Sequence, residues 1–312
     1  MVPSMYSNLT NRGPVRASGM CDGWAAGGIP PAAGAGAGRL PRRLRLGVAL
    51  ALLVIAAEAA AQERELRVCA DPDNLPFSNE RLEGFENKIA KLIADDLNAS
   101  LQYTWASQRG RFVRQTLKAG KCDLIIGVPV GFEPVLSTKP YYRSTYVFVY
   151  AKSRNLDLRS FDDPALRKLK IGLHAFGNDG ANSPPAHALA RRGITRNIVG
   201  FTILDTDDSP PGRIIDAVAK GDIDVAIVWG PFAGYFAARA PVELEVVPVS
   251  SGTDVPAMPF TFEMSMGVRR GETALKEQME GILERRRSDI QKILVTYGVP
   301  LVSETPLAAS QP

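Results

Sequence analysis

Residues 120–150, GKCDLIIGVPVGFEPVLSTKPYYRSTYVFVY, decide the fold of this chain. Gly120 ends a helical segment, and Asp123 to Val128 form an apolar run that stops at Pro129, which is typical of a buried parallel strand. A loop containing Pro and Gly leads from there to Tyr141–Tyr150, a run of aromatic and β-branched residues. We expect this second run to be a strand that crosses between two halves of the protein.

The first part of the stretch is repeated about a hundred residues later. GKCDLIIGVP at 120–129 corresponds to GDIDVAIVWGP at 221–231, and an amphipathic segment precedes each copy (Phe112 to Ala119 and Ile214 to Lys220). Two such helix–Gly–strand units predict an α/β protein of two lobes, each a doubly wound and mostly parallel sheet with flanking helices. This is the organisation of a two-lobed cleft.

The elements around each copy follow the same alternation. In the first lobe we expect strands at Leu66–Ala70, Leu101–Trp105 and Asp123–Val128, in the spatial order 2-1-3, and helices at Gly84–Asn98 and Arg109–Ala119. In the second we expect strands at Leu169–Leu173, Phe201–Leu204 and Asp224–Val228, a helix capped by Ser183 before Pro184-Pro185, and a helix ending at Lys220. Glu243–Val249 and Met264–Val268 are interpreted as return strands, and two helices end the chain. The predicted boundaries are 62–149 plus 250–312 for lobe 1 and 150–249 for lobe 2.

The first 61 residues are typical of an export signal. Arg39 to Arg45 form a basic region, Leu46 to Ala57 form an apolar run too short for an ordinary membrane span, and small residues follow up to Ala61. No other stretch of the sequence is long and apolar enough to span a membrane. We therefore expect a signal peptide, cleavage near Ala61 and a periplasmic location.

The formal charge belongs to this leader. Residues 1–61 contain six Arg and two acids, which accounts for the whole net charge of +4 of the 312-residue chain. The remainder carries equal numbers of basic and acidic side chains. A neutral mature chain gives no electrostatic reason to expect binding to nucleic acid or to an anionic membrane surface.

Two cysteines remain once the leader, with Cys21, is set aside. Cys69 and Cys122 belong to strands that the 2-1-3 order makes neighbours, and an exported protein meets an oxidising compartment. We expect them to form a disulfide. The chain has only His174 and His187, no CxxC pair, no GxSxG and no P-loop, so we expect no metal site, no cofactor and no catalytic site.

Ligands of open α/β sheets bind beyond the carboxyl ends of the strands. The loops there predict a cleft for a ligand or partner. Asp71 and Asn74 are more typical of turns than of ligand contacts, and the two tyrosines also suit packing at a hinge. The helix start after 177–182 could hold an anion, but most capped helices bind nothing. The basic run 285–287 is interpreted as a solvated helix face. The predicted cleft residues are Asp71, Asn74, Phe77, Tyr141, Tyr142, Arg143, Asp179, Asn182, Trp229 and Phe232.

Several longer phrases resemble a known family. CADPDNLPFSNERLEGFENKIAKLIADDL (69–97), GKCDLIIGVP and KPYYRSTYVFVY are similar to the family 3 extracellular solute-binding proteins of ABC importers. CADPDNLPFSN, YYRSTYVFV, NSPPAHALARRGI and DVAIVWGPFAGYFA are closest to one branch, the periplasmic accessory J proteins associated with PQQ-dependent methanol dehydrogenases (MxaJ/XoxJ type). The resemblance covers most of residues 66–236 and implies a hinged, type II-like periplasmic binding fold.

The chain departs from the amino-acid-binding members of that family. Those members carry an Arg after the third strand and an Asp after the second-lobe strand, whereas this chain has Pro129–Pro134 without Arg and Trp229-Gly230-Pro231 at the second place. A zwitterion would lose both charged partners, each worth about 1.5–3 kcal/mol. We therefore do not expect capture of free amino acids.

Three functions follow from the resemblance. The first is a non-enzymatic accessory protein that matures, activates or stabilises a periplasmic PQQ-dependent methanol or alcohol dehydrogenase, in contact with it and with its cytochrome c. The second is an importer receptor for an uncharged or aromatic small molecule held in the cleft, and the third is an enzyme on the same scaffold. For the first, we expect an exposed set of mainly aromatic residues to make the protein contact, with Trp229 as an anchor: Phe77, Tyr141, Tyr142, Arg143, Trp229 and Phe232.

Overall fold

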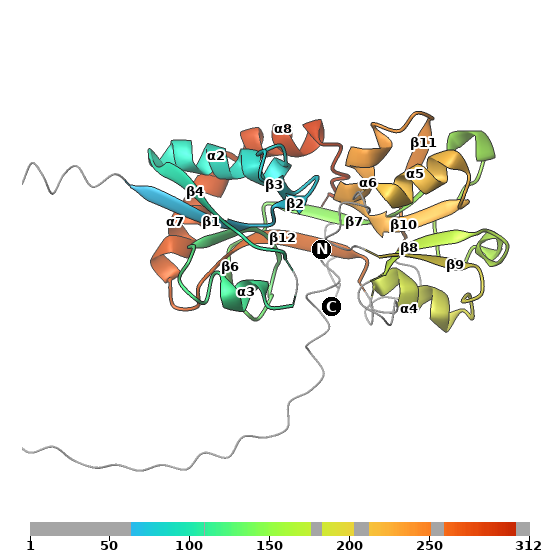
Figure 1. The fold of residues 1–312 in the computed structure, drawn as a ribbon, viewed down its shortest axis with the longest axis horizontal. Helices are drawn as coiled ribbons and strands as arrows, with labels where there is room; N and C mark the ends of the chain where they lie inside the picture. Colours follow the sequence, from blue (N-terminus) through green and yellow to red (C-terminus); the bar gives the residue numbers. More distant parts are fainter. Residues whose placement is uncertain (1–63, 109, 176–182, 203–211, 251–258, 304–312) are drawn as a thin grey trace, which may run out of the picture. The chain divides into compact units, whose positions relative to one another are not determined.

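Strand β7 (Tyr142–Ala151) joins two sets of strands in the computed structural model (Figure 1). The structure describes residues 64–108, 110–175, 183–202, 212–250 and 259–303. Its main sheet has 10 strands in the order β4-β1-β5-β12-β7-β10-β8-β9, with β11 paired to β7 and β6 paired to β12. Helices flank this sheet, which is the α/β class that the sequence predicts.

The first set contains β1 (Glu65–Ala70), β4 (Ser100–Trp105) and β5 (Leu124–Pro129), and β1 lies between the other two in parallel. The predicted order 2-1-3 is confirmed. Helix α2 (Phe85–Leu97) agrees with the expected helix, but α3 (Phe112–Gln115) is shorter than predicted. The helix ends at Thr116, whose backbone (φ −116°, ψ −84°) leaves the helical region, and the Thr116 hydroxyl donates to the Phe112 carbonyl at 2.7 Å.

The second set repeats this arrangement with β8 (Ile171–Ala175) between β9 (Ile198–Thr202) and β10 (Val225–Trp229). Helix α4 (Pro184–Arg191) begins after Ser183, whose hydroxyl accepts the Ala186 N–H at 3.4 Å, and α5 (Arg213–Lys220) precedes β10. Gly120 and Gly221 have φ values of +72° and +77° before β5 and β10. The repeated glycine is therefore explained, because only glycine adopts this left-handed turn without strain.

Three antiparallel strands connect the two sets: β7, β11 (Leu244–Pro248) and β12 (Thr261–Val268). The first half of β7 pairs with β12, with Arg143 opposite Glu263, and its second half pairs with β10 and β11. The predicted crossing strand and return strands are confirmed. The short elements are β2 (Asp73–Asn74), β3 (Ser78–Asn79), β6 (Leu136–Ser137) and the 3-10 helices η2 (Lys152–Arg154) and η3 (Pro164–Arg167).

Helix α6 (Gly230–Ala237) starts directly after β10, where the sequence analysis expected a loop. Pro231 lies in the first helical turn, where its missing N–H costs nothing. Farther along, Gly234 contacts the backbone of the segment that follows α8: a Cβ atom at Gly234 would lie 1.8 Å from the Gly298 carbonyl oxygen. The backbone of α6 therefore packs directly on that segment.

The chain ends with α7 (Thr273–Arg285) and α8 (Arg287–Thr296). Met279, Ile282 and Leu283 of α7 and Ile290 and Leu294 of α8 are buried, which is the apolar face that their spacing predicts. None of the helices in the described ranges is long and apolar enough to cross a membrane. The lobe boundaries at 149/150 and 249/250 stay a prediction.

Candidate functional site: a groove beside the crossing strand

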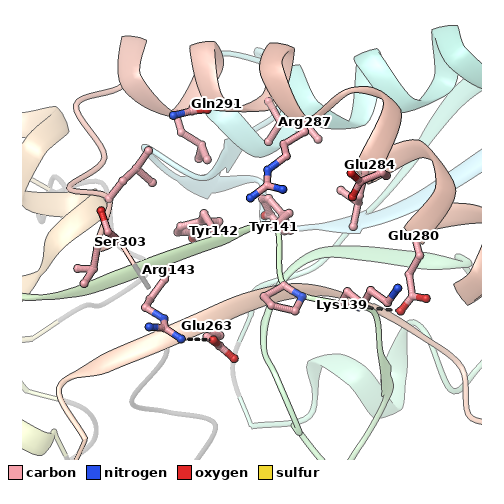
Figure 2. Close-up of a pocket in the computed structure, with 16 residues that line it drawn as sticks. Lys139, Tyr141, Tyr142, Arg143, Glu263, Glu280, Glu284, Arg287, Gln291 and Ser303 are labelled. Carbon is pink, nitrogen blue, oxygen red and sulfur yellow. Dashed lines mark hydrogen bonds and ion pairs between the residues drawn. The ribbon is translucent and has the colours of Figure 1, made fainter. Parts of the chain in front are cut away.

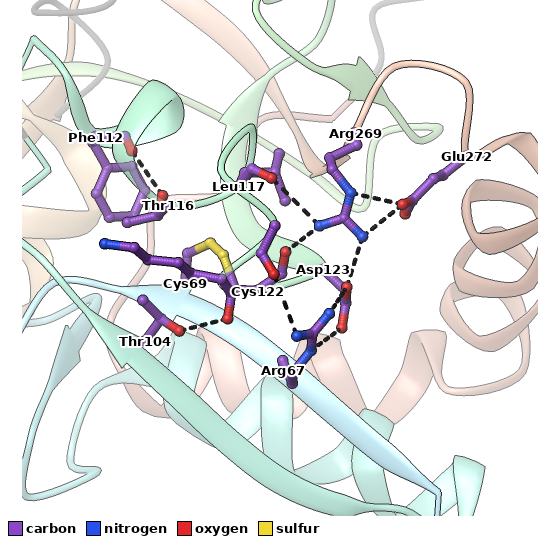
Figure 3. The surroundings of a disulfide bond; sticks show 12 residues. Arg67, Cys69, Thr104, Phe112, Thr116, Leu117, Cys122, Asp123, Arg269 and Glu272 are labelled. Carbon is purple, nitrogen blue, oxygen red and sulfur yellow. Dashed lines mark hydrogen bonds and ion pairs between the residues drawn. A yellow bond between two sulfur atoms is a disulfide. The ribbon is translucent and has the colours of Figure 1, made fainter.

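The disulfide between Cys69 and Cys122 is present, with Cα atoms 5.5 Å apart (Figure 3). Next to it, Asp123 accepts hydrogen bonds from Arg67 at 2.6 and 2.8 Å and from Arg269 at 2.7 Å. Burial by itself would raise the pKa of Asp123, but the two guanidinium groups outweigh it and hold the pKa below its ordinary value. This cluster ties β1, β5 and the end of β12 together, so we assign it a structural role.

The loop after β1 is held by its own hydrogen bonds. Asp71 is buried, and its carboxylate accepts the N–H groups of Asp73 at 3.0 Å and Gln108 at 2.7 Å. Asn74 belongs to the two-residue strand β2, and Phe77 is buried with its ring 5.3 Å from that of Phe85. The turn-forming interpretation of Asp71 is therefore the one that the contacts support.

Trp229 is a core residue rather than an exposed anchor. Its side chain is 3% exposed and packs at ring distances of 5.6 Å from Tyr146 and 5.7 Å from Phe262. β10 lies between β7 and β8, so an aromatic side chain at its end is covered by residues from neighbouring strands. This corrects the expectation of an exposed Trp229.

Phe232 is buried as well, because the helix that replaces the expected loop turns its side chain back toward the sheet. Its ring lies 4.7 Å from the ring of His174 and 4.7 Å from that of Phe236. Burial lowers the pKa of His174 to about 3, so this histidine is neutral at physiological pH. Asp179 and Asn182 lie outside the described residues.

Three predicted residues, Tyr141, Tyr142 and Arg143, are brought together in a groove of about 640 Å³ (Figure 2). We call this the β7 groove. Its floor is the start of β7, and its walls are β12, α7, α8 and the segment after α8. The lining residues are Lys139, Pro140, Tyr141, Tyr142, Arg143, Glu263, Glu280, Leu283, Glu284, Arg287, Ile290, Gln291, Leu294, Leu301, Val302 and Ser303.

Three of the six charged side chains that line the β7 groove have ion pairs within the described residues. Arg143 forms an ion pair with Glu263, the residue opposite it on β12. Glu280 accepts the backbone N–H of Lys139 at 2.7 Å and pairs with Lys276 at 2.7 Å. Burial would raise the pKa of Glu280, but the hydrogen bond from Lys276 and that backbone bond lower it overall. Glu280 is therefore an anion at neutral pH.

The two tyrosines of the floor differ in their hydroxyl groups. Tyr141 donates to the Ile126 carbonyl at 3.1 Å, whereas the buried Tyr142 hydroxyl has no hydrogen-bond partner in the described part of the chain. Their rings lie 5.0 Å apart at 61°. Burial raises the pKa of both hydroxyls well above the ordinary value, so both stay protonated and neutral.

The helical wall of the groove contains residues that no sequence pattern singles out. Of the basic run 285–287, Arg285 and Arg286 both bind Asp96, and Arg287 alone reaches into the groove from α8 (Figure 2). Neither Arg287 nor Glu284 has an ion pair among the residues described by the structure. The spacing of apolar residues predicts which face of a helix is buried, but it does not predict on which strand the helix packs. The sequence therefore does not show that Arg287 and Glu284 lie over β7.

Nearly all of the described region matches a known protein family. The family model of the bacterial extracellular solute-binding proteins, family 3, matches residues 66–299. The chain belongs to this family. Its fold is accordingly a periplasmic-binding-protein fold, as expected, and the family is one of binding proteins.

The similar proteins include members of one branch. The chain is 32% identical over 263 residues to "Protein MoxJ" of Methylorubrum extorquens, covering 79% of this chain and 85% of that protein. It is 29% identical over 273 residues to "Protein MoxJ" of Paracoccus denitrificans, covering 82% and 96%. The crystal structure of the periplasmic binding protein XoxJ from Methylobacterium extorquens AM1 matches with a TM-score of 0.64 and 39% identity, covering 77% of this chain and all of that one. The resemblance to the J branch is confirmed.

Proposed function

We propose that this protein is a periplasmic, non-catalytic accessory factor that binds a PQQ-dependent methanol or alcohol dehydrogenase and matures, activates or stabilises it. The observation that carries the proposal is similarity over most of the chain to MoxJ and XoxJ proteins, which belong to the branch that the sequence resembles. The leader is removed near Ala61, and the mature protein acts in the periplasm, where the dehydrogenase and its cytochrome c are found.

The chemistry of the cleft loops supports binding to a protein rather than capture of an amino acid. The loop between β5 and β6 contains no Arg to clamp a carboxylate. The place of the ammonium-binding Asp is taken by Trp229, which is buried, and by the start of α6. Both charged partners of a zwitterion are absent, while the scaffold itself is retained.

Deletion of the gene tests the proposal. We expect dehydrogenase activity in the periplasmic extract to fall, to return when the wild-type gene is supplied on a plasmid, and the dehydrogenase to co-purify with the tagged protein. Unchanged activity together with the absence of a co-purifying dehydrogenase would refute it.

One observation favours the receptor function as a second candidate. The Trp229 indole N–H and the Tyr146 hydroxyl are buried next to each other without a hydrogen-bond partner in the described residues. Two unpaired buried donors suit a small uncharged ligand that accepts hydrogen bonds. A calorimetric screen of neutral and aromatic solutes tests this function. We expect a saturable ligand if it holds, with weaker binding by the Tyr146→Phe variant, and the absence of any such ligand would refute it.

A further inference from the structure

We infer that the β7 groove is where the dehydrogenase docks, and that it binds a segment of that protein carrying a carboxylate next to an apolar side chain. This inference rests on the proposed function and names its contact surface. The groove takes the place of the contact surface that the sequence predicts, because Phe77, Trp229 and Phe232 are buried in the core and cannot reach a partner.

The first argument concerns the charges of the groove. Lys139, Glu284 and Arg287 are the groove side chains without an ion pair in the described residues, and Arg287 is the one that extends over the aromatic floor. Arg143 is matched by Glu263, and Glu280 by Lys276, so these four side chains already have partners. Arg287 has none within the described residues, and Figure 2 shows its side chain extending from α8 toward Tyr141 and Tyr142. A guanidinium group over an aromatic floor offers a carboxylate two parallel hydrogen bonds, and Arg and Tyr are the residues that dominate protein contacts.

The position of Arg287 in its helix gives a second argument. Arg287 is the first residue of α8. The N-terminus of a helix carries partial positive charge, which favours an incoming carboxylate. α7 ends at Arg285, so Arg287 also follows a helix C-terminus, where a cation is favourable. The start of α8 therefore adds to the attraction that the guanidinium group exerts on a carboxylate.

The third argument is the apolar surface beside Arg287. Leu283, Ile290 and Leu294 form the back of the groove and are buried by their own helices, whereas Leu301 at the edge is 38% exposed. An apolar side chain of the partner would cover Leu301 and remove this surface from water.

Glu284 makes the inference testable in both directions. It lines the same groove as Arg287, is exposed, and has no ion pair in the described chain. A carboxylate bound by Arg287 would be repelled by Glu284. If the bound segment were basic instead, Glu284 would attract it and Arg287 would repel it. The two residues therefore predict effects of opposite sign.

The test measures binding of the purified dehydrogenase to the mature wild-type protein and to three variants, by biolayer interferometry at low and at high salt. Arg287→Glu should weaken binding at least tenfold, and Glu284→Gln should leave it unchanged or strengthen it. The matched control is Arg114→Glu, which reverses an exposed Arg of α3 far from the groove residues. It should bind like the wild type. Because glutamate suits the first position of a helix, Arg287→Glu does not weaken α8. Wild-type binding should also weaken as salt rises, since the ion pair is solvent-exposed.

The outcomes separate the two proposals. Full binding by Arg287→Glu, while the wild type binds the dehydrogenase, overturns the docking site and leaves the proposed function standing. Stronger binding by Arg287→Glu and weaker binding by Glu284→Gln would show that the bound segment is basic, which overturns the inference of an acidic segment. A wild-type protein that does not bind the dehydrogenase overturns both the function and the docking site.

Discussion

Removal of the disulfide should cost this protein a large part of its stability. Cys69 and Cys122 are 53 residues apart and both are buried. In the chain-entropy model, a closed loop of that length is worth about 4 kcal/mol at 25 °C, because the bond restricts the unfolded chain. The double variant Cys69→Ala, Cys122→Ala should still fold, since Asp123 with its two arginines continues to hold β1 against β5.

The assay is urea unfolding of the oxidised wild type and of the double variant, each with and without a reducing agent. We expect the variant to lose about 4 kcal/mol of unfolding free energy, a fall in Tm of roughly 10 °C for a domain of this size. The reducing agent should lower the wild type toward the variant and leave the variant unchanged. A difference below about 1 kcal/mol between the oxidised wild type and the variant would show that the loop-closure reasoning is wrong.

Three further predictions concern other residues. Gly234→Ala should lower the free energy of urea unfolding by roughly 1–3 kcal/mol, because the added methyl group would lie 1.8 Å from the Gly298 carbonyl oxygen. The control Gly281→Ala in α7 meets only a flexible Arg side chain and should be neutral or stabilising, so equal effects of the two variants would contradict the prediction. Burial raises the pKa of Glu86 to about 8, so the folded state keeps a proton that the unfolded state releases near pH 4.5. The contribution of Glu86 to stability should therefore be full below that pH and be lost as the pH rises toward 8. Glu86→Gln should remove this loss between about pH 5 and 8, and parallel pH profiles of the two proteins in that range would exclude it. Calorimetry should find no common L-amino acid with a Kd below about 10 μM, a binding free energy near −7 kcal/mol, because residues 129–134 contain no Arg. An L-amino acid that binds more tightly than this would contradict the prediction.

Much of the fold could be predicted because its signals are local. The helix–Gly–strand units at 120–129 and 221–231 predicted β5 and β10, and their glycines do adopt positive φ. The β-branched and aromatic run at 141–150 predicted β7, and Ser183 caps α4 as its position before two prolines indicates. The disulfide followed from the strand order together with the presence of only two cysteines in residues 62–312.

The candidate site was predicted only in part. Tyr141, Tyr142 and Arg143 line the β7 groove, but Arg287 and Glu284 were not found, because they come from helices more than a hundred residues away along the chain. Gly230-Pro231 suits a loop as well as the first turn of a helix, and the helix that the pair begins turns Phe232 inward.

The sequence alone determined most of the order of helices and strands, the neutral charge of residues 62–312, the cysteine pair and the absence of the amino-acid clamps, since each depends on residue types and short spacings. Only the tertiary structure decided which aromatic side chains are buried and which charges remain unpaired. Trp229 is covered by residues of β7 and β12, and Arg143 is matched by Glu263, 120 residues later. Burial and ion pairing depend on which distant segments pack together, and a local sequence pattern does not predict that packing.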